Sequence, residues 1–206
     1  MPAVPANIQT LLLAAGHGRR FGADKLVAPL PDGTPLVLAT ARALLAAGAR
    51  VLAVVRDDDA AGQGAGALLR DHLGVEVIGC AEAALGMGHS IACGVRHSPA
   101  ADGWLVALAD MPFVQPGTIA ALQDALASGA SLAAPGHNGR RGHPVGFARR
   151  WRESLSALSG DSGARGLLAA HPDALTLIDV DDPGVFIDID RPEDIRPDRH
   201  WPRPRA

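Results

Sequence analysis

Short apolar runs alternate along this chain with amphipathic stretches, and this alternation constrains its fold more than any other feature. Runs such as VLAVV and LVALA are continuous rather than alternating, as in strands that helices cover on both faces. Strands that alternate with helices are typical of βαβ units. The sequence therefore predicts an α/β fold with a mostly parallel central sheet.

The same pattern gives the expected limits of each element. Strands are expected at residues 8–14, 50–55, 75–79, 104–108, 131–134 and 175–180. Helices are expected at residues 35–47, 62–73, 90–96, 116–127, 149–158 and 163–170. Pro116 suits the first turn of its helix, and Gly48 and Gly129 stand where helices are expected to end. We also expect a solvated loop at 57–59 and a functional loop at 135–146.

Length and composition exclude several classes of protein. The chain of 206 residues favours one domain, expected at residues 1–195, followed by a poorly ordered tail at 196–206. A net charge of −3 and an aromatic content of 3% argue against nucleic-acid binding. The apolar runs are too short to cross a membrane, and the first residues do not resemble a signal peptide, so we expect a cytoplasmic protein. Cys80 and Cys93 lack the spacing of a zinc site.

The segment LLLAAGHGRRFGADKL at positions 11–26 leads from an apolar strand into a loop with three glycines and three basic residues. Glycines let backbone N–H groups turn toward an anion, and the cations supply opposite charge, so a polyphosphate is the expected ligand. The spacing G-x-G-x-x-x-G is one residue longer than a dinucleotide fingerprint, which disfavours a redox enzyme, and Lys25 is not followed by Ser or Thr as in a Walker A loop.

The pattern LAAG-x-G-x-R-FG-x-D-K-L in this segment resembles the signature of the MobA-like nucleotidyltransferases, and particularly the molybdenum cofactor cytidylyltransferases. That resemblance implies a Rossmann-like three-layer sandwich of the nucleotide-diphospho-sugar-transferase type. It also implies that Arg20 and Lys25 bind the triphosphate, and that Gly16 and Gly18 allow its close approach. His17 departs from the Ser or Thr that is usual there.

Further segments resemble the same family in the same order. GMGHSI at 86–91 resembles a turn against the base and ribose, although Ser90 could also be a plain helix N-cap. ALADMP at 107–112 brings Asp110 to the carboxyl end of a strand, where a carboxylate suits Mg²⁺ and where the family holds its metal. FIDIDRPED at 186–194 resembles the closing segment that completes the metal site through Asp190, and we expect Asp188 and Asp190 on one side of a strand.

Two other matching segments, RGHPVGF at 141–147 and GDSGAR at 160–165, lie in the part of the family fold that receives a phosphorylated pterin. They imply a second anion site near Arg165. His143 could serve as an acid–base group, or its role could be to position the loop. Glu193 and Asp194 are expected to start a short helix, where negative charge is favourable.

The resemblance implies transfer of CMP from CTP to the terminal phosphate of molybdopterin, with release of pyrophosphate and with Mg²⁺ as cofactor. It implies Arg20, Lys25 and Asp110 as catalytic residues and Asp110 and Asp190 as metal ligands. The implied nucleotide-binding residues are Leu13, Ala14, Ala15, Gly16, Gly18, Arg20, Lys25, Gly86, Gly88 and Ser90. The implied residues for the second substrate are Gly142, His143, Pro144, Asp161 and Arg165.

The choice of nucleotide depends on residues 13–16. Family members that use cytosine carry L-A-A-G and those that use guanine carry L-A-G-G, so Leu13-Ala14-Ala15-Gly16 favours CTP over GTP. The Ala15 methyl group would narrow the loop beside the base. Alternatives are GTP as substrate, another small phosphate as acceptor, or an accessory protein that delivers cofactor to a molybdenum hydroxylase. An active enzyme could also hand its product to such a hydroxylase or to its maturation factor.

Overall fold

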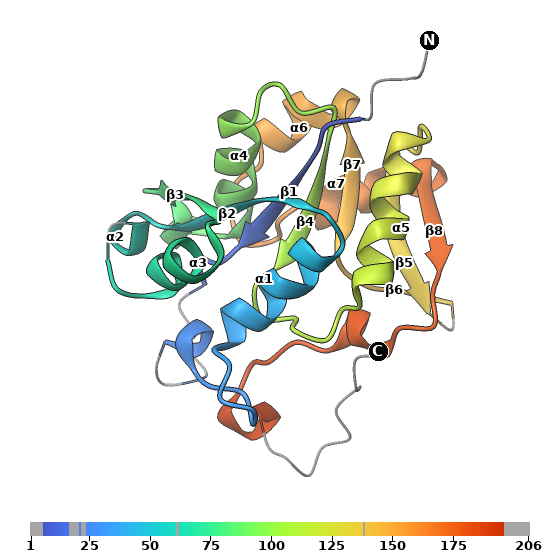
Figure 1. The fold of residues 1–206 in the computed structure, drawn as a ribbon. Helices are drawn as coiled ribbons and strands as arrows, with labels where there is room; N and C mark the ends of the chain where they lie inside the picture. Colours follow the sequence, from blue (N-terminus) through green and yellow to red (C-terminus); the bar gives the residue numbers. More distant parts are fainter. Residues whose placement is uncertain (1–5, 17–20, 22–23, 61, 138, 196–206) are drawn as a thin grey trace.

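The computed structural model describes residues 6–16, 21, 24–60, 62–137 and 139–195. Its centre is a mixed, mostly parallel sheet in the order β3-β2-β1-β4-β7-β5-β6, with β8 paired to β5 (Figure 1). β1 lies parallel to both β2 and β4, whereas β7 is antiparallel to β4 and β5. The strands are β1 Ile8–Leu13, β2 Arg50–Arg56, β3 Glu76–Cys80, β4 Gly103–Leu108, β5 Leu132–His137, β6 Arg140–Arg141, β7 Val145–Ala148 and β8 Leu175–Asp179.

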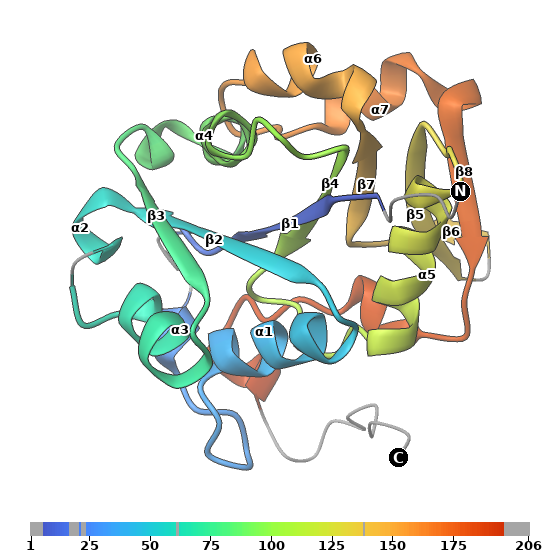
Figure 2. The same ribbon diagram turned by 45° about the horizontal axis from the view of Figure 1, so that its top comes forward.

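Helices cover both faces of the sheet and make three layers. In Figure 2, α4, α6 and α7 lie on one side of the strands and α1, α3 and α5 on the other. The α-helices are α1 Leu36–Ala46, α2 Asp57–Ala60, α3 Ala65–Leu73, α4 Met87–His97, α5 Pro116–Ala127, α6 Arg152–Ser156 and α7 Arg165–Ala170. Short 3₁₀ turns occupy Lys25–Val27, Ala83–Leu85, Arg149–Trp151, Pro172–Ala174, Pro183–Phe186 and Pro192–Ile195.

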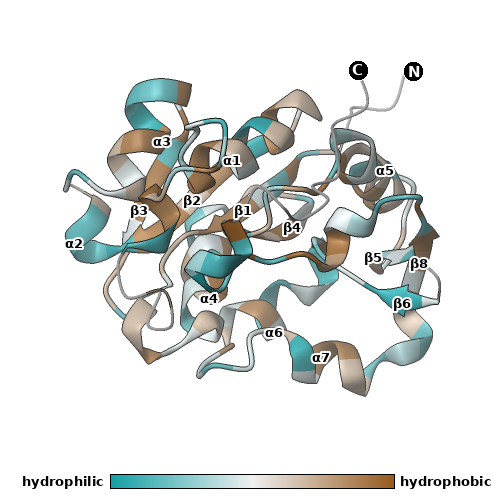
Figure 3. Ribbon diagram, turned by 90° about the horizontal axis from the view of Figure 1, so that it is seen from below, coloured by the Kyte–Doolittle hydropathy of each residue, from teal (hydrophilic) through white to brown (hydrophobic). Residues whose placement is uncertain are grey.

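Successive residues of the central strands enter two different hydrophobic cores. Leu12 of β1 packs with Leu36 and Ile119 on the α1 and α5 side, whereas Leu11 and Leu13 pack with the residues under α4 and α6. This follows from the two-residue repeat of a strand, which sends neighbouring side chains to opposite faces. A continuous apolar run is therefore what a strand covered on both faces requires. Seen from below, β1 is hydrophobic, whereas α2 and β6 at the periphery are hydrophilic (Figure 3).

Helix ends follow the signals in the sequence. Pro116 is the first residue of α5. Gly48 and Gly129 follow the last residues of α1 and α5 with φ of 71° and 101°, a backbone conformation that glycine adopts without steric cost. No helix among the described residues combines the length and the hydropathy that crossing a bilayer requires.

The structure corrects three expectations about elements. The segment 135–146 is not simply a loop, because it includes β6 and the start of β7, which lies between β4 and β5 in the sheet. Residues 57–59 form part of α2, where Asp59 is buried and its Oδ2 accepts a hydrogen bond from the Gly66 N–H at 3.3 Å. The expected helix at 149–158 is divided into a 3₁₀ turn and the short α6.

Candidate active site

The candidate site lies where the carboxyl ends of β1 and β4 meet. β1 and β4 are parallel neighbours, and the chain adds its next strands on one side of β1 (β2, β3) and then on the other (β4). Parallel α/β sheets commonly bind ligands at such a switch point in the strand order. A cavity of about 390 Å³ opens there. Its lining includes Leu13, Ala15, Gly16, Gly86, Ser90 and Asp110, all predicted to contact nucleotide or metal.

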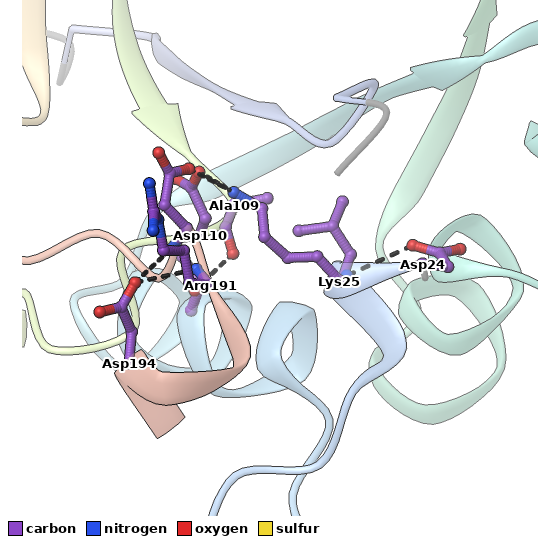
Figure 4. Close-up of polar contacts among 9 residues, drawn as sticks. Asp24, Lys25, Ala109, Asp110, Arg191 and Asp194 are labelled. Carbon is purple, nitrogen blue, oxygen red and sulfur yellow. Dashed lines mark hydrogen bonds and ion pairs between the residues drawn. The ribbon is translucent and has the colours of Figure 1, made fainter. Parts of the chain in front are cut away.

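Three charged side chains from distant parts of the chain meet beside this cavity. The Lys25 Nζ lies 2.8 Å from Asp110 Oδ2, and Figure 4 shows these two side chains pointing toward each other. The same Nζ lies 3.2 Å from Asp190 Oδ1. The lysine side chain is only 10% exposed, compared with 22% for Asp110 and 39% for Asp190. The predicted triphosphate cation and the two predicted metal ligands therefore form one cluster, with the ammonium between the carboxylates.

Backbone and hydroxyl contacts hold Asp110 at the end of β4. The Ala109 N–H donates to the Leu13 carbonyl at 3.1 Å, which extends the pairing of β1 and β4 by one residue. The buried Thr40 hydroxyl of α1 donates to the Ala109 carbonyl at 2.9 Å. The Asp110 carbonyl accepts from the Ile189 N–H at 2.9 Å, so the same residue also receives the C-terminal segment.

That C-terminal segment runs below the sheet after β8 in the view of Figure 1 and brings Asp190 to Lys25. Asp188 and Asp190 do not lie in a strand as expected, because their segment runs between two 3₁₀ turns and outside the eight strands of the sheet. The N–H groups of Asp190 and Arg191 donate to Asp194 Oδ2 at 3.0 and 2.9 Å. The short helix expected at Glu193 and Asp194 is the 3₁₀ turn Pro192–Ile195. The Asp194 carboxylate in this turn fixes the backbone of Asp190.

Burial and neighbouring charge both act on the cluster. Burial lowers the pKa of Lys25, but Asp110 and Asp190 outweigh this effect and leave that pKa above its ordinary value. Burial raises the pKa of Asp188, and the charges of Asp110 and Asp190 raise it further. Lys25 is therefore a cation at neutral pH.

The donor set fits a hard divalent cation. Asp110 Oδ1 is buried and has no hydrogen-bond partner among the described residues, which leaves a carboxylate oxygen available for a ligand bond. Within the described ranges, no group of three or more His, Cys, Asp or Glu side chains could hold a metal by itself. Mg²⁺ commonly binds one or two carboxylates and completes its shell with water and substrate phosphates, so Asp110 and Asp190 suffice.

The GMG turn at 86–88 packs directly against the GDSGAR segment. The Gly88 N–H donates to the Gly160 carbonyl at 2.8 Å, and a Cβ at Gly88 would lie 2.5 Å from the Ser159 carbonyl oxygen. Gly86 has a φ of 127° and leaves no room for a Cβ beside Gly160. Ser90 is buried inside α4, whose N-cap is Gly86, so it is not the N-cap that the sequence left open. Met87, in the middle of this turn, lines both the first cavity and the second cavity described below.

A second cavity of about 180 Å³ shares Met87, Leu108 and Asp161 with the first. Arg141, His143 and Arg165 also line it, beside apolar side chains that include Phe147 and Leu168. The combination of two guanidinium groups with an apolar wall suits a ligand that has both an anionic and an apolar part.

His143 is the titratable group at the centre of this second cavity. Burial lowers its pKa, and the Arg141 and Arg165 charges lower it further against the opposing effect of Asp110. Its Nδ1 is buried without a hydrogen-bond partner in the described part of the chain. His143 is therefore a neutral imidazole at pH 7.

Three residues predicted to bind substrate, Ala14, Gly142 and Pro144, do not line either of these two cavities. Ala14 is buried and its N–H donates to the Val54 carbonyl at 2.9 Å. Gly142 packs against Val185, where a Cβ would lie 2.6 Å from the valine Cβ, and Pro144 lines a separate small apolar cavity. Gly18 and Arg20 lie outside the described residues, as do His17 and the tail at 196–206.

Sequence reasoning missed Met87 and Arg141 as lining residues. Met87 is 40% exposed and lines both cavities. Arg141 could have been predicted from the sequence, because it is the first residue of the RGHPVGF segment. It lies in the exposed strand β6. The position of Met87 depends on the packing of the GMG turn against Gly160, which no local pattern reveals.

The model of the MobA-like NTP transferase domain matches residues 10–175. The purine catabolism protein PucB of Bacillus subtilis is 34% identical over 192 residues, covering 89% of this chain and 92% of that protein. The nicotine blue oxidoreductase of Paenarthrobacter nicotinovorans is 31% identical with the same coverage. The crystal structure of Rv0371c from Mycobacterium tuberculosis has a TM-score of 0.75 at 24% identity, over 93% of this chain and 96% of its own.

Proposed function

The chain belongs to the MobA-like NTP transferase family and is a nucleotidyltransferase, and on that premise we propose that it transfers CMP from CTP to the terminal phosphate of a molybdopterin-type cofactor. The observation that carries the proposal is the junction of two cavities of different chemistry. Asp110 lines the first cavity and is paired beside it with Lys25, which also pairs with Asp190. Arg141 and Arg165 line the second cavity. This arrangement suits a reaction in which two phosphate-bearing substrates meet.

In the proposed reaction, a phosphate oxygen of the acceptor attacks the α-phosphorus of CTP. The bond from that phosphorus to the bridging oxygen of pyrophosphate breaks, and pyrophosphate leaves with the electron pair. The nucleophile is already an anion, so the protein's task is to position the substrates and to neutralise charge. Bound Mg²⁺ would supply further charge neutralisation at the phosphates.

The described residues divide this task. Asp110 and Asp190 would hold the metal, and Lys25 would offset phosphate charge on the nucleotide. Arg165 and Arg141 would bind the acceptor phosphate through charge-assisted hydrogen bonds. The neutral His143 would orient the acceptor through a hydrogen bond without adding charge. Arg20, Gly18 and the rest of the first loop are proposed triphosphate contacts from the family resemblance alone.

Pyrophosphate release tests this proposal directly. The chain is incubated with Mg²⁺, molybdenum-loaded molybdopterin and either CTP, GTP or ATP, and strong release is expected with CTP. Asp110→Ala is expected to lose at least about 10²–10³-fold in rate while its circular dichroism stays unchanged. Release with GTP alone would overturn the choice of nucleotide. Activity of Asp110→Ala close to that of the unmodified chain would overturn the role of Asp110.

The similarity to the nicotine blue oxidoreductase of Paenarthrobacter nicotinovorans favours one second candidate function, that of an oxidoreductase. The first loop departs from the dinucleotide fingerprint, which argues against it. NADPH binding without Mg²⁺, measured by fluorescence, separates the two candidates: tight binding would favour the oxidoreductase. For the nucleotidyltransferase, we propose that the product is passed to a molybdenum hydroxylase or to its maturation factor.

A further inference from the structure

The Lys25 ammonium occupies the space between the two carboxylates that suit the metal. Its Nζ is 2.8 Å from Asp110 Oδ2 and 3.2 Å from Asp190 Oδ1, distances typical of direct ion pairs. A divalent cation held by the same two residues would have to lie within a few ångströms of this ammonium. The metal and the ammonium would then place three positive charges against the two carboxylates that hold them, in a site where the lysine side chain is only 10% exposed and where Asp188 is a further carboxylate within electrostatic reach.

Such an arrangement is electrostatically unfavourable, because partial burial removes the water that would screen the repulsion. Lys25 and the metal therefore compete for Asp110 and Asp190 as long as no other anion is present. A triphosphate changes this balance, because its oxygens offer the ammonium an alternative partner and offer the metal further ligands.

We propose that Lys25 is an internal competitor of the metal, which holds the carboxylate pair in the empty site and releases it when the nucleotide arrives. The inference rests on the proposed function for the identity of the nucleotide, but its first part concerns the metal alone. It adds a positioning role to Lys25 beyond phosphate binding.

The local structure allows Lys25 to exchange partners. Lys25 is the first residue of the 3₁₀ turn Lys25–Val27, and the Asp24 carboxylate caps this turn by accepting from the Leu26 N–H at 3.3 Å. The backbone is therefore fixed, while the four-carbon stem of lysine can turn the ammonium from the carboxylates toward the first cavity. The consequence is that metal and nucleotide bind cooperatively, each raising the affinity of the other by the same factor.

Binding of Mn²⁺ to the full chain without nucleotide tests the competition. The free ion is measured by electron paramagnetic resonance for the unmodified chain and for Lys25→Met, Lys25→Gln and Lys25→Arg. The two neutral variants are expected to bind Mn²⁺ about tenfold or more tightly than the unmodified chain, since one buried repulsive charge is gone. Lys25→Arg keeps the charge and is expected to bind as weakly as the unmodified chain.

Two controls make the result specific. Adding Asp110→Asn to Lys25→Met is expected to abolish the gain, and circular dichroism establishes that each variant is folded. Mn²⁺ binding by the folded neutral variants that is equal to or weaker than that of the unmodified chain would overturn the inference. So would a gain that persists in the double variant, because the ion would then bind elsewhere.

A second arm measures the coupling to nucleotide in the unmodified chain. CTP is expected to raise the affinity for Mn²⁺, after correction for Mn²⁺ bound by free CTP, and to raise it less in Lys25→Met. A measurable increase in Mn²⁺ affinity on adding CTP that is equal in the two proteins would overturn the release step. If the metal-alone arm succeeds while CTP has no effect on either protein, the proposed nucleotide is wrong and the competition stands.

Discussion

Single residues of the site act through partners that are remote in sequence. Lys25 meets Asp110 across 85 positions and Asp190 across 165 positions. Hydrogen bonds to the neighbouring backbone fix their positions. The Thr40 hydroxyl donates to the Ala109 carbonyl next to Asp110, and the Asp190 N–H donates to the Asp194 carboxylate. The chemistry of the cluster therefore depends on loop ends whose backbone is held rigidly.

Ala15 offers a test of nucleotide choice at this scale. Its buried methyl group lines the first cavity, beside Leu13 and Gly16. Ala15→Gly is expected to lower the CTP:GTP ratio of kcat/KM by about 10-fold, because one methyl group in a pocket contributes only about 1–3 kcal/mol of discrimination. Pyrophosphate release with each nucleotide measures the ratio. An unchanged ratio in a folded variant would show that Ala15 does not determine the choice.

At the scale of elements, α5 depends on a carboxylate supplied by the distant C-terminal segment. The buried Asp182 accepts through Oδ2 from the Gln115 N–H at 2.9 Å and from the Thr118 hydroxyl at 2.7 Å. Its Oδ1 accepts from the Gly184 N–H at 3.0 Å. Asp182 thus anchors the N-terminus of α5, at its N-cap residue Gln115 and at Thr118, to the segment that carries Asp190.

Asp182→Ala is expected to lower the free energy of unfolding by about 2–4 kcal/mol, because it leaves buried donors without an acceptor. Urea denaturation followed by circular dichroism measures the loss. Asp124→Ala, at an exposed position of the same helix, is the matched control and is expected to stay within about 0.5 kcal/mol of the unmodified chain. Equal losses in the two variants would show that the hydrogen bonds accepted by Asp182 contribute nothing to stability.

The contrast between β1 and β7 shows how far the sequence predicts these elements. β1 was predicted within one residue, because its apolar run and its position before the glycine loop are local signals. β7 has four residues, follows Pro144 and pairs with β4 and β5, so only its tertiary partners identify it as a strand. The contact between Asp182 and the N-terminus of α5 was missed for the same reason, since it joins residues 67 positions apart.

The site residues show the same division. Asp110 was predicted because it lies two residues after the end of a strand, a local signal that places it at the edge of the sheet. Asp190 was predicted from family resemblance, with the wrong local structure. The direct contact of Lys25 with both carboxylates required the packing of three separate segments and was not foreseen.

At the scale of the whole molecule, the two cavities meet at β4. The parallel strands β1 and β4 border the first, while β4 and the antiparallel strands β6 and β7 border the second. His143 lies between β6 and β7, and its backbone N–H donates to the Val185 carbonyl at 3.0 Å. Protonation of this residue therefore couples the stability of the molecule to pH.

The sign of that coupling follows from the lowered pKa of His143. The unfolded imidazole takes up a proton near its ordinary pKa of about 6.5, whereas the folded one resists it, so the unfolded state binds more protons just below that pH. The contribution of His143 is complete above about pH 6.5 and is lost as the pH falls through the lower, folded pKa. The free energy of unfolding is therefore expected to fall between about pH 7.5 and about pH 5.5.

His143→Asn removes this titration, so its stability is expected to change less over the same pH range than that of the unmodified chain. Urea denaturation of both proteins at the two pH values measures the difference, and every other titrating side chain is common to both. An equal or steeper loss of stability in His143→Asn would contradict the prediction. A smaller loss would show that the buried imidazole is held neutral by the fold, as the proposed recognition of an anionic substrate between Arg141 and Arg165 requires.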